Sequence, residues 1–210
     1  RSVRGRGRRL GVCGLSTERF NAAVAAIDQA NAADPTMVVV RGVEQPLALA
    51  HGQLAAQWVA AMHPAAEPEL LLAARAHHLR RWALPRTQYE PGKAGYLRWK
   101  RDQRQRHGRD VGELLATVGF DASAIERVQQ LVRRDHLATD PGAQAVEDAA
   151  CLVFIETQLA AIAAQLDHDH LVDVIRKTAK KMSSAALARV SEIPLGTAER
   201  QLLATALALP

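Results

Sequence analysis

The side chains best suited to chemistry in this sequence are histidines and one aspartate inside apolar helical stretches. Helical periodicity assigns them to the buried faces of four different predicted helices: His51, His77, His136 and Asp148. A buried polar group without a hydrogen-bond partner is energetically costly. We therefore expect these four side chains to lie together around a common partner or ligand. Neutral imidazoles and a carboxylate on facing helices are natural ligands for a divalent metal ion. The alternative for each histidine is a core position in which it bonds a neighbouring carbonyl oxygen.

Residues 73–109 form a second chemical feature, rich in basic and aromatic side chains. Between Arg75 and Arg109 there are eleven lysines and arginines against two acids, and the same window holds two of the three tryptophans and both tyrosines. Arginine forks suit phosphate oxygens, so the interpretation we favour is a site for a phosphorylated small molecule. Its predicted substrate-binding residues are Arg75, Arg81, Arg86, Tyr96, Arg98 and Lys177.

Two other interpretations of this basic window remain open. In the first, it binds RNA or DNA, and Tyr96 and Trp99 stack on the bases. The near-zero net charge of the chain beyond its first nine residues argues against this, because affinity for nucleic acid comes largely from phosphate contacts. In the second, arginine–acid pairs fix the loop and a partner protein binds outside it.

Prolines divide the chain into helices that would position these residues. Pro35 follows the end of a first helix, Pro46 begins a second, and Pro68 opens a third that we expect to end near Trp82. Residues 37–40 are the one strand-like run, and four residues are too few to make a sheet. Nearly every other segment repeats apolar residues at helical spacing. The sequence therefore predicts an all-α fold, a single compact helical bundle.

Charge and composition suggest how the chain is divided. Five arginines in the first nine residues, with no acid among them, predict a disordered basic tail over residues 1–15. The helical domain would cover residues 16–190, and residues 191–210 would form an extension with a short helix. No apolar run approaches the length of a membrane span, and Cys13 and Cys151 lie in unlike contexts, so we expect no membrane partner, no disulfide and a cytoplasmic location.

The order of the candidate ligands resembles a known pattern. His51, then His77-His78 at the end of an Ala/Leu-rich helix, then Asp148 in EDAACLVF, is similar to the HD-domain superfamily of metal-dependent phosphohydrolases. That family has a lone histidine, a His-Asp pair and a distant aspartate on an all-α bundle. The resemblance implies that His51, His77 and Asp148 bind a metal, with His78 at the place of the pair's aspartate. His136 resembles an additional histidine that some members use.

A closer resemblance covers about residues 20–190. The segments AARAHHLRRW, PRTQYEPGKAGYLRW, QAVEDAACLVFIE and DVIRKTAKKMS look like the bacterial branch of the domain-of-unknown-function family 4202. Several motifs match in the right order. Because that family is uncharacterised, the resemblance implies little about activity.

Together these features lead to the hypothesis of an HD-like, metal-dependent hydrolase of a phosphorylated small molecule. The divalent ion would be manganese, cobalt, zinc or iron, with His51, His77, His78 and Asp148 as ligands. His78 or His136 would handle the proton as the catalytic group. The alternatives are an HD-like iron-dependent oxygenase and a metal-free helical binding or regulatory module with a protein or RNA partner. The sequence leaves the oligomeric state open.

Overall fold

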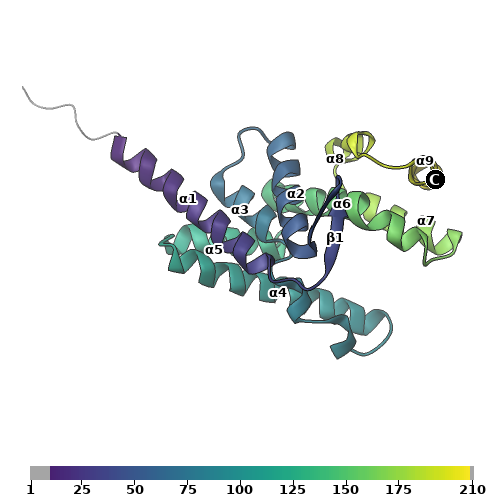
Figure 1. The fold of residues 1–210 in the computed structure, drawn as a ribbon, viewed down its shortest axis with the longest axis horizontal. Coiled ribbons are helices and arrows are strands. Elements are labelled where there is room, and N and C mark those ends of the chain that lie inside the picture. The colour runs from purple at the N-terminus through teal and green to yellow at the C-terminus, as the bar shows by residue number, and fades with distance from the viewer. Residues whose placement is uncertain (1–9, 209–210) are drawn as a thin grey trace, which may run out of the picture.

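The structure, a computed structural model, describes residues 10–208 and is almost entirely helical in that range. Figure 1 shows the order of the elements along the chain. The α-helices are α1 Leu10–Asn31, α2 Leu47–Met62, α3 Pro68–Ala76, α4 Lys93–Thr117, α5 Ala122–Arg133, α6 Pro141–Ala163, α7 His168–Ala179, α8 Ser184–Arg189 and α9 Thr197–Ala208. The shorter elements are 3-10 turns η1 Arg81–Ala83, η2 Arg86–Gln88 and η3 Val190–Glu192, and strands β1 Met37–Val40 and β2 Val43–Pro46. The all-α prediction is confirmed.

Two apolar cores hold these helices together, and α3 and α6 contribute to both. One core packs α1, α4 and α5 against α3 and the beginning of α6, around side chains such as Ile27, Leu72 and Leu115. The other packs α2, α7, α8 and α9 against the remainder of α6, around Leu152 and Leu159. Side chains that α6 turns away from both cores are therefore placed between two groups of helices.

The close approach of α2 and α3 brings two predicted site histidines together. It occurs at Gly52, where an added Cβ would lie 2.4 Å from the carbonyl oxygen of Arg75. Only a residue without a side chain permits helix backbones to pack this closely. His51, beside this glycine, is thereby held against the end of α3.

Helix α3 ends at Ala76, earlier than the position near Trp82 predicted from sequence. Arg80 adopts a left-handed conformation with φ of 50°, which a continuing helix does not allow. Asn31 on α1 accepts a hydrogen bond from the Arg80 backbone N–H at 3.0 Å, and Arg106 on α4 donates to its carbonyl oxygen at 3.0 Å. These contacts from distant segments stop the helix and turn His78 back toward His77.

The end of α5 corrects the sequence assignment of His136. The helix was expected to carry His136 on its buried face, but it stops at Arg133, and Arg134 and His136 have positive φ angles of 56° and 57°. His136 is exposed to solvent as a result. The buried side chain in this turn is that of Arg134.

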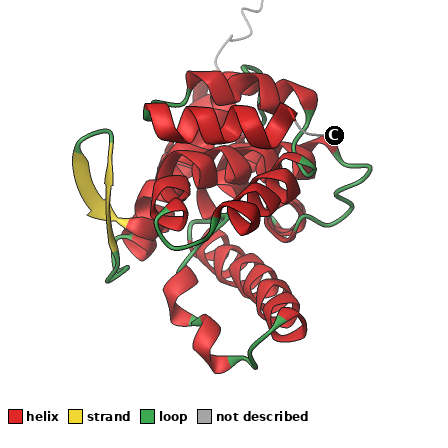
Figure 2. Ribbon diagram, turned by 90° about the vertical axis from the view of Figure 1, so that its right-hand side faces the viewer, coloured by secondary structure: helices red, strands yellow, loops and turns green. Residues whose placement is uncertain are grey.

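Strands β1 and β2 form an antiparallel hairpin that projects from the side of the helices (Figure 2). The sequence indicated β1 but not its partner, because VEQP lacks the apolar pattern of a strand. Arg41 and Gly42 at the turn both have positive φ, which suits a tight two-residue hairpin. The expectation that residues 37–40 make no sheet is wrong, because they pair with β2 in a two-stranded sheet, which holds the only strands in the described part of the chain.

The two ends of the chain differ from the domain limits drawn from sequence. Helix α1 begins at Leu10, inside the segment predicted as a tail, and residues 1–9 lie outside the described residues. At the other end, Leu203 and Ala206 of α9 are buried in the same core as α7. The segment predicted as an extension is thus packed against the domain. Over the described residues, no helix has the length and apolarity needed to span a membrane.

Candidate functional site

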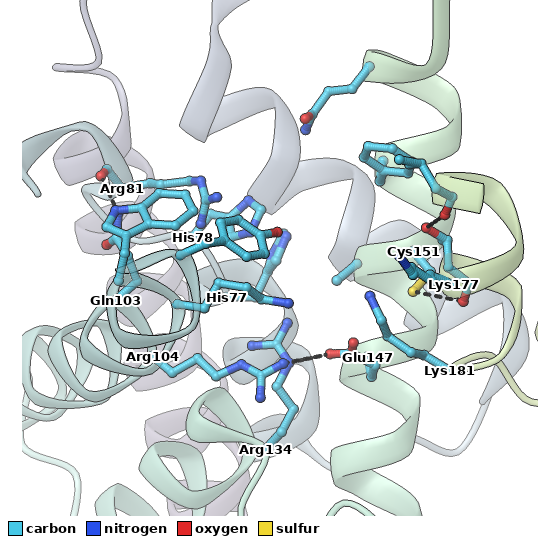
Figure 3. Close-up of a pocket in the computed structure, with 18 of the residues that line it drawn as sticks. His77, His78, Arg81, Gln103, Arg104, Arg134, Glu147, Cys151, Lys177 and Lys181 are labelled. Atoms are coloured by element: carbon cyan, nitrogen blue, oxygen red, sulfur yellow. Dashed lines mark hydrogen bonds and ion pairs between the residues drawn. The ribbon is translucent and has the colours of Figure 1, made fainter. Parts of the chain in front are cut away.

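A large cavity of about 980 Å³ lies between the two groups of helices. Its walls come from the end of α3, from α4, from the turn after α5, and from α6 and α7. Among the residues that line the cavity, Glu147 provides the single carboxylate. Seven basic side chains line it as well: Arg81, Lys100, Arg104, Arg134, Lys177, Lys180 and Lys181. Figure 3 shows His77, His78, Arg81 and Gln103 on one side, Lys177 and Lys181 on the other, and Glu147 between them. The cavity is therefore strongly electropositive.

Four histidine rings gather at one wall of this cavity. The ring centroids of His77 and His78 are 4.0 Å apart, those of His51 and His78 5.4 Å, and those of His78 and His107 6.2 Å. His77 and His78 are brought this close because α3 ends before them. His77, His78 and His107 line the cavity, whereas His51 lies behind His78. Among the site histidines expected from sequence, three are thus clustered, and His136 is elsewhere.

Hydrogen bonds fix the orientation of each ring. His77 Nδ1 lies 2.8 Å from the carbonyl oxygen of Ala74, and His107 Nδ1 lies 2.7 Å from that of Leu79. His51 Nδ1 is 3.2 Å from His78 Nδ1. The Nε2 atom of His51 is 3.0 Å from the Thr157 hydroxyl, whose own proton is donated to the Val153 carbonyl. The cluster is therefore positioned through α2, α3, α4 and α6 together.

All four rings are neutral at physiological pH. Burial, followed by the nearby positive charge of Arg81, lowers the pKa of His51 to about 4 and that of His107 to about 3. Burial is also the largest cause that brings the pKa values of His77 and His78 well below the usual 6.5. Neutral imidazoles can act as bases, as hydrogen-bond acceptors or as metal ligands.

Glu147 balances part of the positive charge. Its Oε2 atom accepts hydrogen bonds from Arg134 Nε at 3.0 Å and from Arg104 at 3.4 Å, so two guanidinium groups share one carboxylate. Lys177 is paired with Asp173 one helical turn away. The pKa of Lys100 is lowered by burial first and then by the neighbouring cations Lys181 and Arg104. This like-charge crowding favours the binding of an anion.

Four of the seven basic side chains have no ion-pair partner among the described residues: Arg81, Lys100, Lys180 and Lys181. Two of them rest on aromatic rings at the rim instead. The guanidinium carbon of Arg81 is 4.6 Å from the centre of the Trp99 ring, and Lys100 Nζ is 5.5 Å from that of Tyr96. Tyr96 itself is 45% exposed. Aromatic faces orient these cations without neutralising them.

Asp148, the carboxylate expected to complete a metal site, has other partners. Its Oδ1 accepts from the Ser183 backbone N–H and from Gln144 Nε2, both at 2.8 Å, and its Oδ2 accepts from the Ser183 hydroxyl at 2.6 Å. Within the described residues, no group of three or more His, Cys, Asp or Glu side chains is arranged to hold a metal ion. The expected ligand set of His51, His77, His78 and Asp148 therefore does not fit a metal centre in this arrangement.

Three of the predicted substrate-binding arginines lie outside the cavity lining. Arg75 forms a bidentate ion pair with Asp28 of α1, at 2.6 and 2.5 Å. Arg86 donates to backbone carbonyl oxygens of residues 89, 90 and 92, which fixes the loop before α4. Arg98 is exposed on α4. The other three predicted residues, Arg81, Tyr96 and Lys177, do line the cavity.

Several residues of the cavity were not among those selected from sequence. His107 lies on α4, where the charged residues from Lys100 to Asp110 obscure its helical spacing with the buried Val111 and Leu115. Arg134 is the left-handed residue that ends α5, and Glu147 lies on α6 beside Asp148, the residue that helical periodicity selected. The signal available for His107 was its place in the basic window, four residues after Gln103, which is also buried.

The comparison with protein families agrees with the resemblance found in the sequence. The model of the family described as "Domain of unknown function (DUF4202)" matches residues 21–203. The chain belongs to the DUF4202 family. No curated protein and no solved structure matches the chain. The DUF4202 match covers every wall of the cavity, from α3 to α7, so the electropositive cavity lies within the family domain.

Proposed function

We propose that the cavity binds a phosphorylated small molecule and that the protein hydrolyses its phosphate ester. The observation that carries the proposal is the set of seven basic side chains around one carboxylate in a cavity of about 980 Å³. A cavity of this size suits a metabolite-sized ligand. Crowded cations that lack counterions are stabilised when a polyanion binds among them.

The phosphate would be held by the cations that have no carboxylate partner. Lys180 and Lys181 follow α7 and approach from one wall, whereas Arg81 and Lys100 approach from the other. Lysine provides a compact charge and arginine a planar fork, so both can contact phosphate oxygens. Arg104 and Arg134 add the one charge that Glu147 leaves uncompensated.

The reaction needs a base, and His78 is the residue we assign to that role. In the proposed step the oxygen of a water molecule forms a bond to phosphorus while the bond to the leaving alcohol breaks. The water's proton passes to the neutral His78 ring and is then returned to the leaving oxygen, so the products are an alcohol and inorganic phosphate. The surrounding cations stabilise the charge on the phosphoryl oxygens during transfer.

The HD-like, metal-dependent form of this reaction receives less support than the phosphate site itself. Both oxygens of Asp148 are engaged by Ser183 and Gln144, and the seven cations make the cavity unfavourable for an additional dication. We therefore assign the step above to side chains of the chain. The iron-dependent oxygenase alternative needs the same ligand set.

Calorimetric titration with inorganic phosphate tests the binding part of the proposal. Lys181→Ala and Lys100→Ala should each weaken binding about tenfold, since each removes a charge-assisted contact. Arg109→Ala is the matched control, because Arg109 is exposed on α4 away from the cavity lining and should leave the affinity unchanged. Absence of phosphate binding, or equal effects of all three variants, would contradict the proposal.

The release of phosphate from a panel of phosphate esters tests the chemical part. Turnover should be lost in His78→Asn while phosphate binding is retained, because the base and the anion site are different groups. A binding or regulatory module is the second candidate, favoured by the engagement of Asp148 with Ser183. It predicts tight ester binding with no turnover. Displacement of bound phosphate by short RNA, with a steep salt dependence, would instead support nucleic acid.

A further inference from the structure

The buried polar atoms without partners at the histidine wall are all hydrogen-bond acceptors. Among the described residues that line the cavity, these atoms are His77 Nε2, Gln103 Oε1 and His107 Nε2. The orientation of the Gln103 amide is fixed, because its Nε2 group donates to the carbonyl oxygens of Arg81 and Leu84, both at 2.9 Å. The amide oxygen is therefore correctly placed as the acceptor.

The same reasoning assigns the protons of His77 and His107. In each ring Nδ1 lies within 2.8 Å of a backbone carbonyl oxygen, which has no proton to give. Nδ1 must therefore carry the hydrogen. Neither buried ring has a carboxylate partner among the described residues, and an unpaired buried imidazolium is costly, so Nε2 carries no hydrogen and presents a lone pair.

His78 reaches the same state through a chain of three hydrogen bonds. Thr157 donates its hydroxyl proton to the Val153 carbonyl at 2.7 Å, so its oxygen can only accept from His51 Nε2–H at 3.0 Å. The neutral His51 ring then has a bare Nδ1, which accepts from His78 Nδ1–H at 3.2 Å. His78 is left with an unprotonated Nε2. His51 thus sets the tautomer of His78.

A group that satisfies this wall must bring hydrogen-bond donors. Phosphate oxygens carry no protons when fully ionised and would meet His77 Nε2, Gln103 Oε1 and His107 Nε2 as a repulsive contact, whereas His78 Nε2 accepts from the attacking water in the proposed step. An ammonium group or a metal dication would bring donors or empty orbitals, but seven cations line the same cavity. Hydroxyl groups are donors that carry no charge, and sugar and polyol phosphates bring several of them on one molecule. They fit both the acceptors and the electropositive surroundings.

We propose that the cavity takes a phosphate ester that carries several hydroxyl groups, a sugar or polyol phosphate, with its hydroxyls against His77, Gln103 and His107. Its phosphate lies between the lysines of the opposite side (Figure 3) and the water molecule at His78, where Arg81 also contacts it. This inference rests on the proposed phosphate site and specifies which part of the ligand faces each wall.

Matched pairs of ligands test the inference by calorimetry. Each pair has the same phosphate and carbon count: glycerol 3-phosphate with propyl phosphate, ribose 5-phosphate with pentyl phosphate, and glucose 6-phosphate with hexyl phosphate. In at least one pair the hydroxylated ester should bind about tenfold more tightly, the value of about one well-made hydrogen bond. In His107→Phe this ratio should fall to about one, whereas His63→Phe, which changes a histidine outside the cavity lining, should leave it unchanged.

The possible outcomes separate the two proposals. Equal binding within every pair, or tighter binding of the alkyl esters, would overturn the hydroxyl inference and leave the phosphate site standing. Absence of binding by every ester would overturn the phosphate site itself. Long-range proton–nitrogen NMR spectra of the unliganded protein provide a test without any variant. His77, His78 and His107 should each show a protonated Nδ1 and a bare Nε2, and a proton on any of these Nε2 atoms would refute the assignment.

Discussion

At the scale of single residues, burial controls the chemistry of the histidine cluster. His51, His77 and His107 are each about 1% exposed. Transferring a charged imidazolium from water into the protein interior costs more free energy than transferring the neutral ring. The folded state therefore binds protons at these histidines more weakly than the unfolded chain does. The backbone carbonyls of Ala74 and Leu79 then select which nitrogen keeps the single proton. Reactivity at the cavity wall is therefore a consequence of packing.

The stability of the protein should fall in mild acid. The pKa values of His51 and His107 are about 4 and about 3 in the folded state, against the usual 6.5, so in this window the unfolded chain binds more protons. The stabilisation is complete above pH ~6.5 and is lost as pH falls toward the folded pKa values. From about pH 7 to about pH 5, each of the two histidines should lower the free energy of unfolding by about 2 kcal/mol.

Urea unfolding at both pH values measures this change. His107→Phe provides the control, since it removes one of the titrating groups and should make the pH dependence shallower by about the contribution of one histidine. A free energy of unfolding that is the same at the two pH values would contradict the neutral assignment.

At the scale of elements, helix α6 places the adjacent carboxylates of Glu147 and Asp148 in different surroundings. Glu147 lines the cavity and pairs with Arg134, while Asp148 accepts hydrogen bonds from the Ser183 backbone and hydroxyl at the beginning of α8. Side chains of consecutive residues on a helix point about 100° apart. Glu147 can therefore line the cavity while Asp148 bonds the segment at the beginning of α8. In this arrangement Asp148 acts on stability.

Asp148→Ala should lower the free energy of unfolding by about 2 kcal/mol, because it removes the acceptor of three hydrogen bonds from the part-buried donors of Ser183 and Gln144. Phosphate affinity of the folded protein should change less than about twofold, since Asp148 is outside the cavity lining. Urea unfolding and calorimetry measure the two effects. Glu113→Ala, at an exposed position on α4, should alter neither. A large loss of phosphate affinity in Asp148→Ala would show instead that Asp148 contributes to the binding site.

At the scale of the whole molecule, the fold concentrates positive charge that the sequence spreads over several segments. Basic residues from α4, from the turn after α5 and from the end of α7 line one cavity between two apolar cores. Fixed cations of this kind attract an anion without requiring a bound metal. The affinity for phosphate should therefore come from the side chains.

Removal of metal ions tests this view. Treatment with a chelator, followed by dialysis, should leave the affinity for inorganic phosphate unchanged within about twofold in calorimetry. Elemental analysis of the same sample before treatment shows which ions, if any, are carried. Loss of affinity that manganese, cobalt, zinc or iron restores would support the predicted metal site at His51, His77 and His78 instead.

Much of the fold was determined by local sequence. Pro35 and Pro68 mark the limits of helices α1 and α3, and Asp121, Asp140 and Asp167 cap helices at the positions where such residues are expected. The basic and aromatic character of residues 73–109 likewise pointed to the region that forms one wall of the cavity. These signals act within a few residues of one another, so they can be recognised without knowing the rest of the structure.

The partners of the polar side chains were decided only by the tertiary structure. Arg75 is of a residue type that binds phosphate, but it forms an ion pair with Asp28. Asp148 is of a residue type that binds metal ions, but it accepts a hydrogen bond from Ser183. In both cases, helices distant in sequence bring the partner near. His78 joins the cluster because Asn31 and Arg106 hold Arg80 in a left-handed turn. Periodicity specifies which face of a helix is buried. Which groups face each other across the core depends on how the helices pack, and that is a property of the whole chain.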